Sequence, residues 1–215
     1  MTTDPIARAR AGDGEAFREL TDMQTNGWQL HFAGSVASDD DSRSAVESLI
    51  NAAAGLPVEF HFDAKFDQLR SLYRRASLYW HATGYGVSAQ EEPQAQEHFG
   101  NTTIEAMSAG AVPIVINSGG QTEIVSHGAD GFLWDSPAEL SGYTVQLATD
   151  RALMMRMSDR ALAASTRFSR AAFIHHLETV IAQMSEPSSL KASRFGRNIG
   201  RETATGETET SRALR

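Results

Sequence analysis

Short apolar runs alternate with longer amphipathic stretches along most of the chain, a pattern typical of strands that alternate with helices. Strands are predicted over residues 28–33, Val58–Phe62, Leu78–His81 and Val112–Ile116. Helical spacing of apolar residues predicts helices over residues 15–23, 39–54, Phe66–Arg75, 102–109, Pro137–Thr149, 152–166 and 169–184. This order predicts an α/β fold with a Rossmann-like, doubly wound parallel sheet.

The same pattern sets the expected domain limits. Residues 1–14 show no period and are predicted to be an irregular N-terminal segment, whereas residues 15–184 form one domain. Residues 185–215 are rich in Ser, Thr, Arg, Glu and Gly, and they have too few apolar residues to form a core. We therefore predict a disordered C-terminal tail.

Composition and charge exclude several classes of protein. The chain has 41% hydrophobic and 21% charged residues and no cysteine, so disulfides and thiolate chemistry are excluded. An apolar run long enough to span a bilayer and a signal-peptide core are both absent, which predicts a cytoplasmic protein. The 187 residues before the basic tail have 13 basic and 24 acidic side chains, a net charge of −11. Such an acidic body disfavours nucleic acid and anionic membranes as partners.

Residues 97–125 contain the most informative pattern. Glu97 precedes a turn at Gly100, and Glu105 follows about one turn into a helix, so both carboxylates can border one site at the carboxyl edge of the sheet. The first N–H groups of that helix, in residues 101–103, suit an anion. Carboxylates suit hydroxyl groups, so the site predicted is one for a sugar, a diphosphate and a ribose. A simpler alternative is a capping box, in which Thr102 caps the helix and Glu105 reaches back to it.

The whole stretch resembles the donor-binding half of the GT-B glycosyltransferases of retaining family 4, which share an E-x7-E signature. The chain matches the family pattern in order at Glu97, Phe99, Gly100, Glu105, Ala106, Met107, Gly110, Pro113, Gly119, Gly120, Glu123, Gly128 and Gly131. The spacer before Pro113 has two residues here and one in many members. The resemblance covers about residues 15–184, and the stretch from Tyr79 to Gly100 is similar to a mannosyltransferase-like subset.

The resemblance implies a nucleotide sugar as donor substrate, with no cofactor or metal required. It gives Glu97 the catalytic position against the sugar hydroxyls and Glu105 the ribose hydroxyls. The resemblance also implies that six further residues contact the substrate: Gly34, Ser35, Phe99, Gly100, Asn101 and Thr102. Asn101 departs from the family, which usually has an aliphatic residue at this position. No metal site is predicted, because His31, His61 and His81 show no ligand pair on one face.

Two features of the family are missing from the chain. There is no room for the acceptor-binding domain, and residues 1–14 do not reproduce the strand with an Arg and a Lys that faces the leaving diphosphate. We therefore expect an incomplete retaining glycosyltransferase that requires a partner domain or self-association. Its acceptor is expected to be a saccharide or a lipid-linked saccharide. Contact with a membrane is expected only through such a lipid-linked acceptor, if at all. The alternative is a non-catalytic module that binds nucleotide sugars or a partner. The motifs of dehydrogenases, P-loop NTPases and nucleophile-elbow hydrolases are absent.

Overall fold

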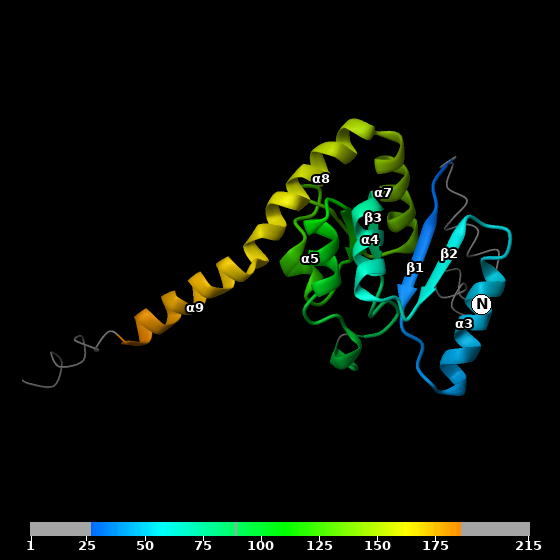
Figure 1. The fold of residues 1–215 in the computed structure, drawn as a ribbon, viewed down its shortest axis with the longest axis horizontal. Helices are drawn as coiled ribbons and strands as arrows, with labels where there is room; N and C mark the ends of the chain where they lie inside the picture. The colour runs from blue at the N-terminus through cyan, green and yellow to red at the C-terminus, as the bar shows by residue number, and fades with distance from the viewer. Residues whose placement is uncertain (1–26, 89, 186–215) are drawn as a thin grey trace, which may run out of the picture. The chain divides into compact units, whose positions relative to one another are not determined.

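The computed structural model describes residues 27–88 and 90–185 (Figure 1). The chain divides into two units, the first ending at Ala172 and the second beginning at Phe173. Each unit is described by itself below. The predicted helix over residues 15–23, the irregular segment 1–14 and the tail beyond Ser185 lie outside the described residues.

All strands of the first unit pair in parallel, as the sequence predicts. β1 (Leu30–Gly34) pairs with β2 (Val58–Phe62), and β4 (Val112–Ile116) lies between β3 (Leu78–His81) and β5 (Phe132–Trp134). The α/β class with parallel strands is thus confirmed. No ladder joins β1 to β3 in the described part of the chain, because a cleft of about 1040 Å³ lies between them. The strands therefore form two sheets where the sequence predicts one.

β4 is buried along its whole length and has helices on both of its faces. Ile114 packs in one apolar cluster with Trp134 and Leu147, whereas Val115 packs in a second cluster with Met107. Alternate residues of a strand point to opposite faces, so the two clusters lie on opposite sides of the sheet. This double covering explains why the run reads as continuously apolar instead of alternating.

Local caps set most helix boundaries. Asp39 accepts hydrogen bonds from the backbone N–H and the hydroxyl of Ser42, at 2.7 and 2.9 Å, at the start of α3 (Asp40–Ala52). Ser136 and Glu139 form a reciprocal capping box at the start of α7 (Pro137–Thr149). Such caps satisfy N–H groups that have no partner inside the helix. The sequence-predicted boundaries of these helices therefore agree with the structure to within two residues.

The other elements complete the path of the chain. α4 (Phe66–Arg75) joins β2 to β3, and α5 (Asn101–Ser108) precedes β4. Further elements follow in chain order: the 3-10 helix η1 (Pro93–Ala95) before α5, and α6 (Gln121–Ile124), α8 (Arg151–Ser165), η2 (Thr166–Phe168) and α9 (Arg170–Ser185) after β4. β5 is a strand that the sequence analysis does not predict. Within residues 27–88 and 90–185, every helix is too short or too polar to cross a bilayer.

Candidate functional site

The loop that precedes α5 holds the carboxylate of Glu97. Its Oε1 accepts hydrogen bonds from the backbone N–H of Phe99 at 3.1 Å and of Gly100 at 2.9 Å. Gly100 has a φ of 61°, and a Cβ there would lie 2.3 Å from Cδ1 of Ile124. Glycine is therefore required on both conformational and steric grounds. The result is an anion fixed at the beginning of α5.

His81, at the carboxyl end of β3, is a neighbour of Glu97 that the sequence analysis does not predict. Its Nε2 lies 3.4 Å from Oε2 of Glu97, and its side chain is only 9% exposed. Burial lowers the pKa of His81, with Glu97 opposing this effect. The buried Nδ1 has no hydrogen-bond partner among the described residues, so a proton there would be unsatisfied. The backbone N–H of Gly100 in turn lowers the pKa of Glu97, and His81 adds to the shift.

These two shifts predict how stability depends on pH. A histidine whose pKa is lowered on folding binds fewer protons in the folded state, so the free energy of unfolding falls as pH drops below about 6.5. The lowered pKa of Glu97 contributes stability above about pH 4.5, which is lost as pH falls through the folded pKa. Urea unfolding between pH 8 and 3 should show that His81→Gln reduces the first dependence, to which His31 also contributes because burial lowers its pKa. Glu97→Gln should reduce the second, to which Asp39 also contributes because the backbone N–H of Ser42 lowers its pKa.

The exposed imidazole of His98, in the same loop, offers the matched control for this experiment. His98→Gln should leave the pH profile of wild type unchanged. A His81→Gln variant with the wild-type slope between pH 7 and 5 would contradict the assignment of that slope to His81.

Glu105 projects from α5 toward α4. Burial raises the pKa of Tyr73 in α4, and the charge of Glu105 and a hydrogen bond to it raise this pKa further. The carboxylate of Glu105 therefore lies near the phenol of Tyr73. Glu105 itself is exposed to solvent, so it is accessible to a ligand.

The capping box predicted as the alternative role of Thr102 and Glu105 is wrong. The N-cap of α5 is Gly100, and no side chain caps the helix. Thr102 lies inside the first turn, where its Oγ1 accepts a 2.7 Å hydrogen bond from the hydroxyl of Tyr79. The left-handed turn at Gly100 starts the helix before Thr102, so its side chain is turned toward β3. Both side chains are consequently free of the capping role.

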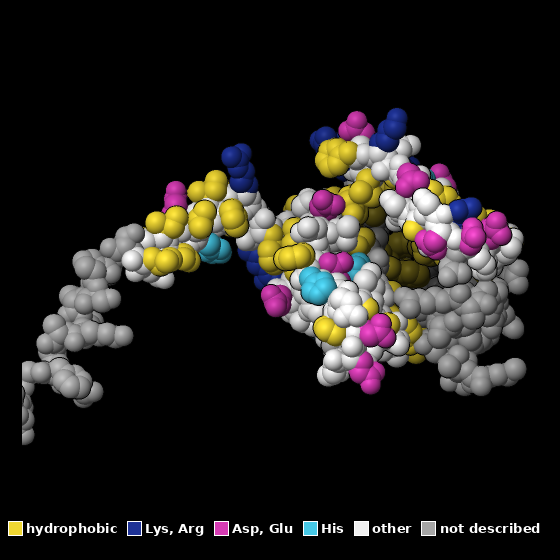
Figure 2. Space-filling view, turned by 90° about the horizontal axis from the view of Figure 1, so that it is seen from below, with side chains coloured by type: hydrophobic (Ala, Val, Ile, Leu, Met, Phe, Trp, Pro, Cys, Tyr) yellow, Lys and Arg dark blue, Asp and Glu magenta, His cyan; other side chains and the backbone are white. Residues whose placement is uncertain are grey.

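Four of the sequence-predicted site residues line the cleft between β1 and β3. Gly34 and Ser35 line it at the end of β1, and Glu97 and Thr102 line it from the α5 side. The other four do not line it: Phe99 is 77% exposed, Gly100 is buried under Ile124, and Asn101 and Glu105 lie on the exposed surface of α5. Figure 2 views the molecule from below and shows a hollow with hydrophobic side chains on its inner wall.

The turn after β4 packs directly against the Glu97 loop. The backbone N–H of Gly120 donates to the carbonyl oxygen of Glu97 at 2.8 Å. A Cβ on Gly119 would lie 2.3 Å from that oxygen, and a Cβ on Gly120 would lie 2.5 Å from the carbonyl oxygen of His98. The two glycines of the motif therefore allow two backbone segments to touch. This contact positions the Glu97 loop from behind.

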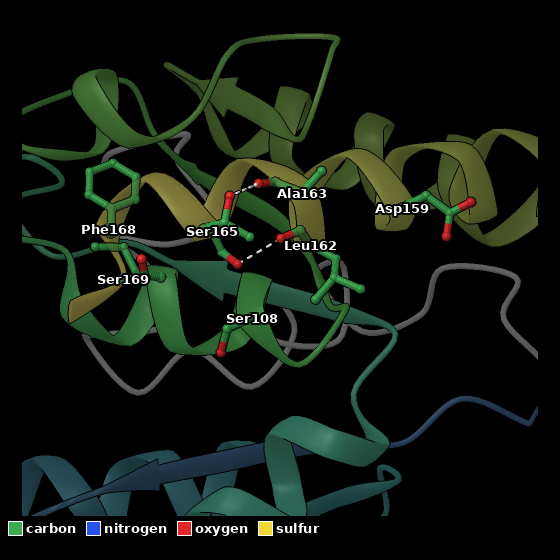
Figure 3. A pocket seen from close by; sticks show the side chains of 9 residues that line it. Ser108, Asp159, Leu162, Ala163, Ser165, Phe168 and Ser169 are labelled. Atoms are coloured by element: carbon green, nitrogen blue, oxygen red, sulfur yellow. Dashed lines mark hydrogen bonds between the residues drawn. The ribbon is translucent and has the colours of Figure 1, made fainter. Parts of the chain in front are cut away.

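A second cavity, of about 540 Å³, lies between α5 and α8 and is mainly apolar (Figure 3). The hydroxyl of Ser165 donates to the carbonyl of Leu162 at 2.8 Å, and that of Ser108 donates to the carbonyl of Glu105 at 2.7 Å. Each hydroxyl therefore already donates to a backbone carbonyl oxygen of its own helix. We assign no function to this cavity.

Comparison with known proteins places these features in a family. A model of the family described as glycosyl transferases group 1 matches residues 14–163. A GDP-Man:Man(3)GlcNAc(2)-PP-Dol alpha-1,2-mannosyltransferase of Dictyostelium discoideum is 33% identical over 140 residues, which cover 63% of this chain and 26% of that protein. The protein of the same description from Yarrowia lipolytica is 37% identical over 112 residues, which cover 48% of this chain and 15% of that protein. The chain thus spans about a quarter or less of these relatives.

Solved structures show the same fold at lower identity. Anabaena Alr3699/HepE in complex with UDP and glucose matches with a TM-score of 0.60 and 20% identity over 76% of this chain and 44% of that chain. The C-terminal domain of a glycosyl transferase group 1 family protein (LpcC) from Francisella tularensis matches with a TM-score of 0.57 and 18% identity over 74% of this chain and 77% of that one. These likenesses support the GT-B, Rossmann-like architecture.

Proposed function

Because the chain belongs to the family of glycosyl transferases group 1, we propose that its cleft binds the nucleotide-sugar donor of a sugar-transfer reaction. The observation behind the proposal is the shared border of the cleft, where Gly34 and Ser35 face Glu97 and Thr102. Glu97 is anionic at neutral pH because its own loop donates two N–H groups to it. Its Oε2, which lies 3.4 Å from Nε2 of His81, keeps a further lone pair to accept a hydrogen bond from a sugar hydroxyl.

The beginning of α5 suits the diphosphate of such a donor. The helix has no side-chain cap, so its first N–H groups are left for solvent or for an anionic ligand. Glu105 lies one turn further, where its exposed carboxylate has lone pairs for ribose hydroxyls. We propose this order of contacts along the donor: sugar at Glu97 on the border of the cleft, diphosphate at residues 101 and 102, and ribose at Glu105 on the exposed surface of α5 beside the cleft.

We propose GDP-mannose as the donor and a lipid-linked saccharide as the acceptor, since the relatives described above are named as GDP-Man mannosyltransferases acting on dolichol-linked sugars. We further propose that transfer retains the configuration of the anomeric carbon and requires no metal. We expect further cationic groups for the leaving diphosphate to come from outside the described lining of the cleft, where Arg75 is the one Lys or Arg side chain.

A partner is also supported by the character of α9. Four exposed large hydrophobic side chains follow one another at helical spacing, so they form one apolar stripe along this helix: Phe173, Leu177, Val180 and Met184. Contiguous apolar surface of this kind typically marks a protein–protein contact. We propose that the acceptor-binding domain or a second copy of the chain covers the stripe.

Calorimetric titration with GDP and GDP-mannose tests the donor site. Glu105→Ala should weaken both ligands by roughly 10- to 100-fold, because the loss of a hydrogen bond to a charged group costs about 1.5–3 kcal/mol. Glu97→Ala should weaken GDP-mannose by a similar factor and leave GDP within about twofold of wild type, because only the sugar contacts Glu97. Equal affinity of wild type and Glu105→Ala for GDP would overturn the assignment.

The control for this titration is Glu47→Ala, which removes an exposed carboxylate from α3. It changes the net charge by the same amount as Glu105→Ala, so it corrects for long-range electrostatics. A second candidate function, a nucleotide-sugar-binding module without transfer, is favoured by the scarcity of lysine. It predicts the same binding results and no turnover after addition of an acceptor-binding domain.

A further inference from the structure

Two histidines and a glutamate meet on the β1–β2 sheet, and one of them, His31, lines the same cleft as Glu97. The register places His31 of β1 opposite Glu59 of β2, and His61 follows Glu59 by two residues on the same face. Nδ1 of His31 lies 3.0 Å from Nε2 of His61. Oxygens of Glu59 lie 3.5 Å from the former nitrogen and 3.6 Å from the latter. Glu59 and His61 therefore form a pair of possible metal ligands on one face of the sheet, although the sequence indicates no such pair.

The separations between the donor atoms are close to the edge of a coordination tetrahedron. Zinc binds imidazole nitrogen and carboxylate oxygen at about 2.0–2.2 Å in tetrahedral sites, so neighbouring ligand atoms are separated by about 3.3–3.6 Å. The two ring nitrogens lie 3.0 Å apart, Oε2 of Glu59 lies 3.5 Å from His31, and its other oxygen, Oε1, lies 3.6 Å from His61. One donor atom from each residue can be chosen so that all three lie within 4.8 Å of one another. A small rotation of the carboxylate therefore brings one oxygen against both imidazoles, and two His with one carboxylate oxygen leave a fourth position for water.

We propose that His31, Glu59 and His61 bind one Zn²⁺ ion and thereby join β1 to β2. The site has a structural role, since an isolated pair of strands is marginal and β1 forms no ladder with β3. Metal that binds the folded sheet and not the unfolded chain stabilises it by mass action. His31 also lines the cleft proposed for the donor, whereas Glu59 and His61 do not, so zinc binding is measured without nucleotide sugar.

Metal binds an imidazole in its neutral form, so the affinity for zinc falls at low pH. Two polar side chains lie beside the cluster. Arg75, at the end of α4, repels a cation and is the main cost of occupancy. Gln29 donates a long 3.4 Å hydrogen bond to Glu59, which orients the carboxylate from outside the cluster.

The competing explanation is a hydrogen bond between the two imidazoles, which also accounts for a 3.0 Å separation and for the stacking of the rings at 5.2 Å. It requires no metal and predicts no stoichiometric binding. Zinc titration therefore separates the two explanations.

The untagged full-length chain is stripped with a chelator and titrated with Zn²⁺ at pH 7.5 against a chromophoric competitor. We expect one ion per chain and a higher unfolding midpoint with zinc than with chelator. His61→Gln and His31→Gln should each weaken binding more than about 100-fold, the upper end of the effect of an outer-shell substitution. Wild type that binds no zinc, or a His61→Gln variant with wild-type affinity, would overturn the proposal.

The double variant His175→Gln, His176→Gln is the matched control, because it removes two adjacent exposed imidazoles from α9. It should bind zinc as wild type does. Should a variant of the cluster unfold, imidazole NMR of wild type replaces it: the ring signals of His31 and His61 should shift on addition of one equivalent of zinc, while those of His98 and His127 stay unchanged. Shifts confined to other histidines would contradict the site.

Discussion

Gly119→Ala is expected to lower the free energy of unfolding by about 2–5 kcal/mol and to weaken GDP-mannose binding at least as much as Glu97→Ala does. Gly119 has a φ of 58°, and the left-handed conformation costs an alanine about 1–2 kcal/mol. The new Cβ would also lie 2.3 Å from the carbonyl oxygen of Glu97, and overpacking of this kind costs about 1–3 kcal/mol more. The loop can yield only by losing the hydrogen bond between that carbonyl and Gly120, which moves Glu97 itself.

Urea unfolding followed by circular dichroism measures the first effect, and calorimetry with GDP-mannose measures the second. Gly120→Ala separates the two causes, because its φ of −63° is ordinary and only the overlap with the carbonyl of His98 remains. It should therefore destabilise the protein by about 1–2 kcal/mol less than Gly119→Ala.

The matched control is Gly142→Ala in the interior of α7, where an added Cβ meets no atom within 4 Å. Alanine is the better helix residue there, so this variant should gain about 0.5–1 kcal/mol. A Gly119→Ala variant as stable as Gly142→Ala would show that the 118–120 turn does not support the Glu97 loop as described.

The second large effect concerns turnover: the chain alone should transfer no measurable sugar. In the proposed reaction an acceptor hydroxyl must be held close to the anomeric carbon and water must be excluded, which requires a second domain over the cleft. Arg75 is the one Lys or Arg side chain among the described residues that line the cleft, and loss of one stabilising group against a leaving diphosphate commonly costs about 10²–10³ in rate. We therefore expect a rate at least about a thousandfold below that of a complete enzyme.

The assay uses the purified chain with labelled GDP-mannose and a dolichol-linked oligosaccharide acceptor. Addition of a separately expressed acceptor-binding domain from a mannosyltransferase relative should produce transfer, and Glu97→Ala should remove it again. Acceptor-dependent turnover by the monomeric chain would refute the expectation. Because donor binding is measured separately, failure of this prediction would not by itself contradict the donor site.

Sequence pattern determined the local elements of this protein. The boundaries of β4, α4 and α7 follow from apolar periodicity and from caps such as Ser136 with Glu139, and both signals depend on residues within one or two turns of each other. The glycines of residues 97–125 are readable for a similar reason, because a left-handed turn such as that at Gly100 admits few other residues. β5 was missed since three residues are too few to show a period.

Only the tertiary structure decided which side chains meet. Glu97 lies beside His81, and His31 lies beside Glu59 and His61, because parallel strands bring together residues that are far apart in sequence in a register that no local signal encodes. Thr102 is not the predicted helix cap for a similar reason. α5 has Gly100 as its N-cap, so Thr102 lies inside the first turn, where its side chain accepts a hydrogen bond from the hydroxyl of Tyr79 on β3. The cleft between β1 and β3 is likewise a property of strand pairing, which depends on the order of strands in space and not on the composition of any one strand.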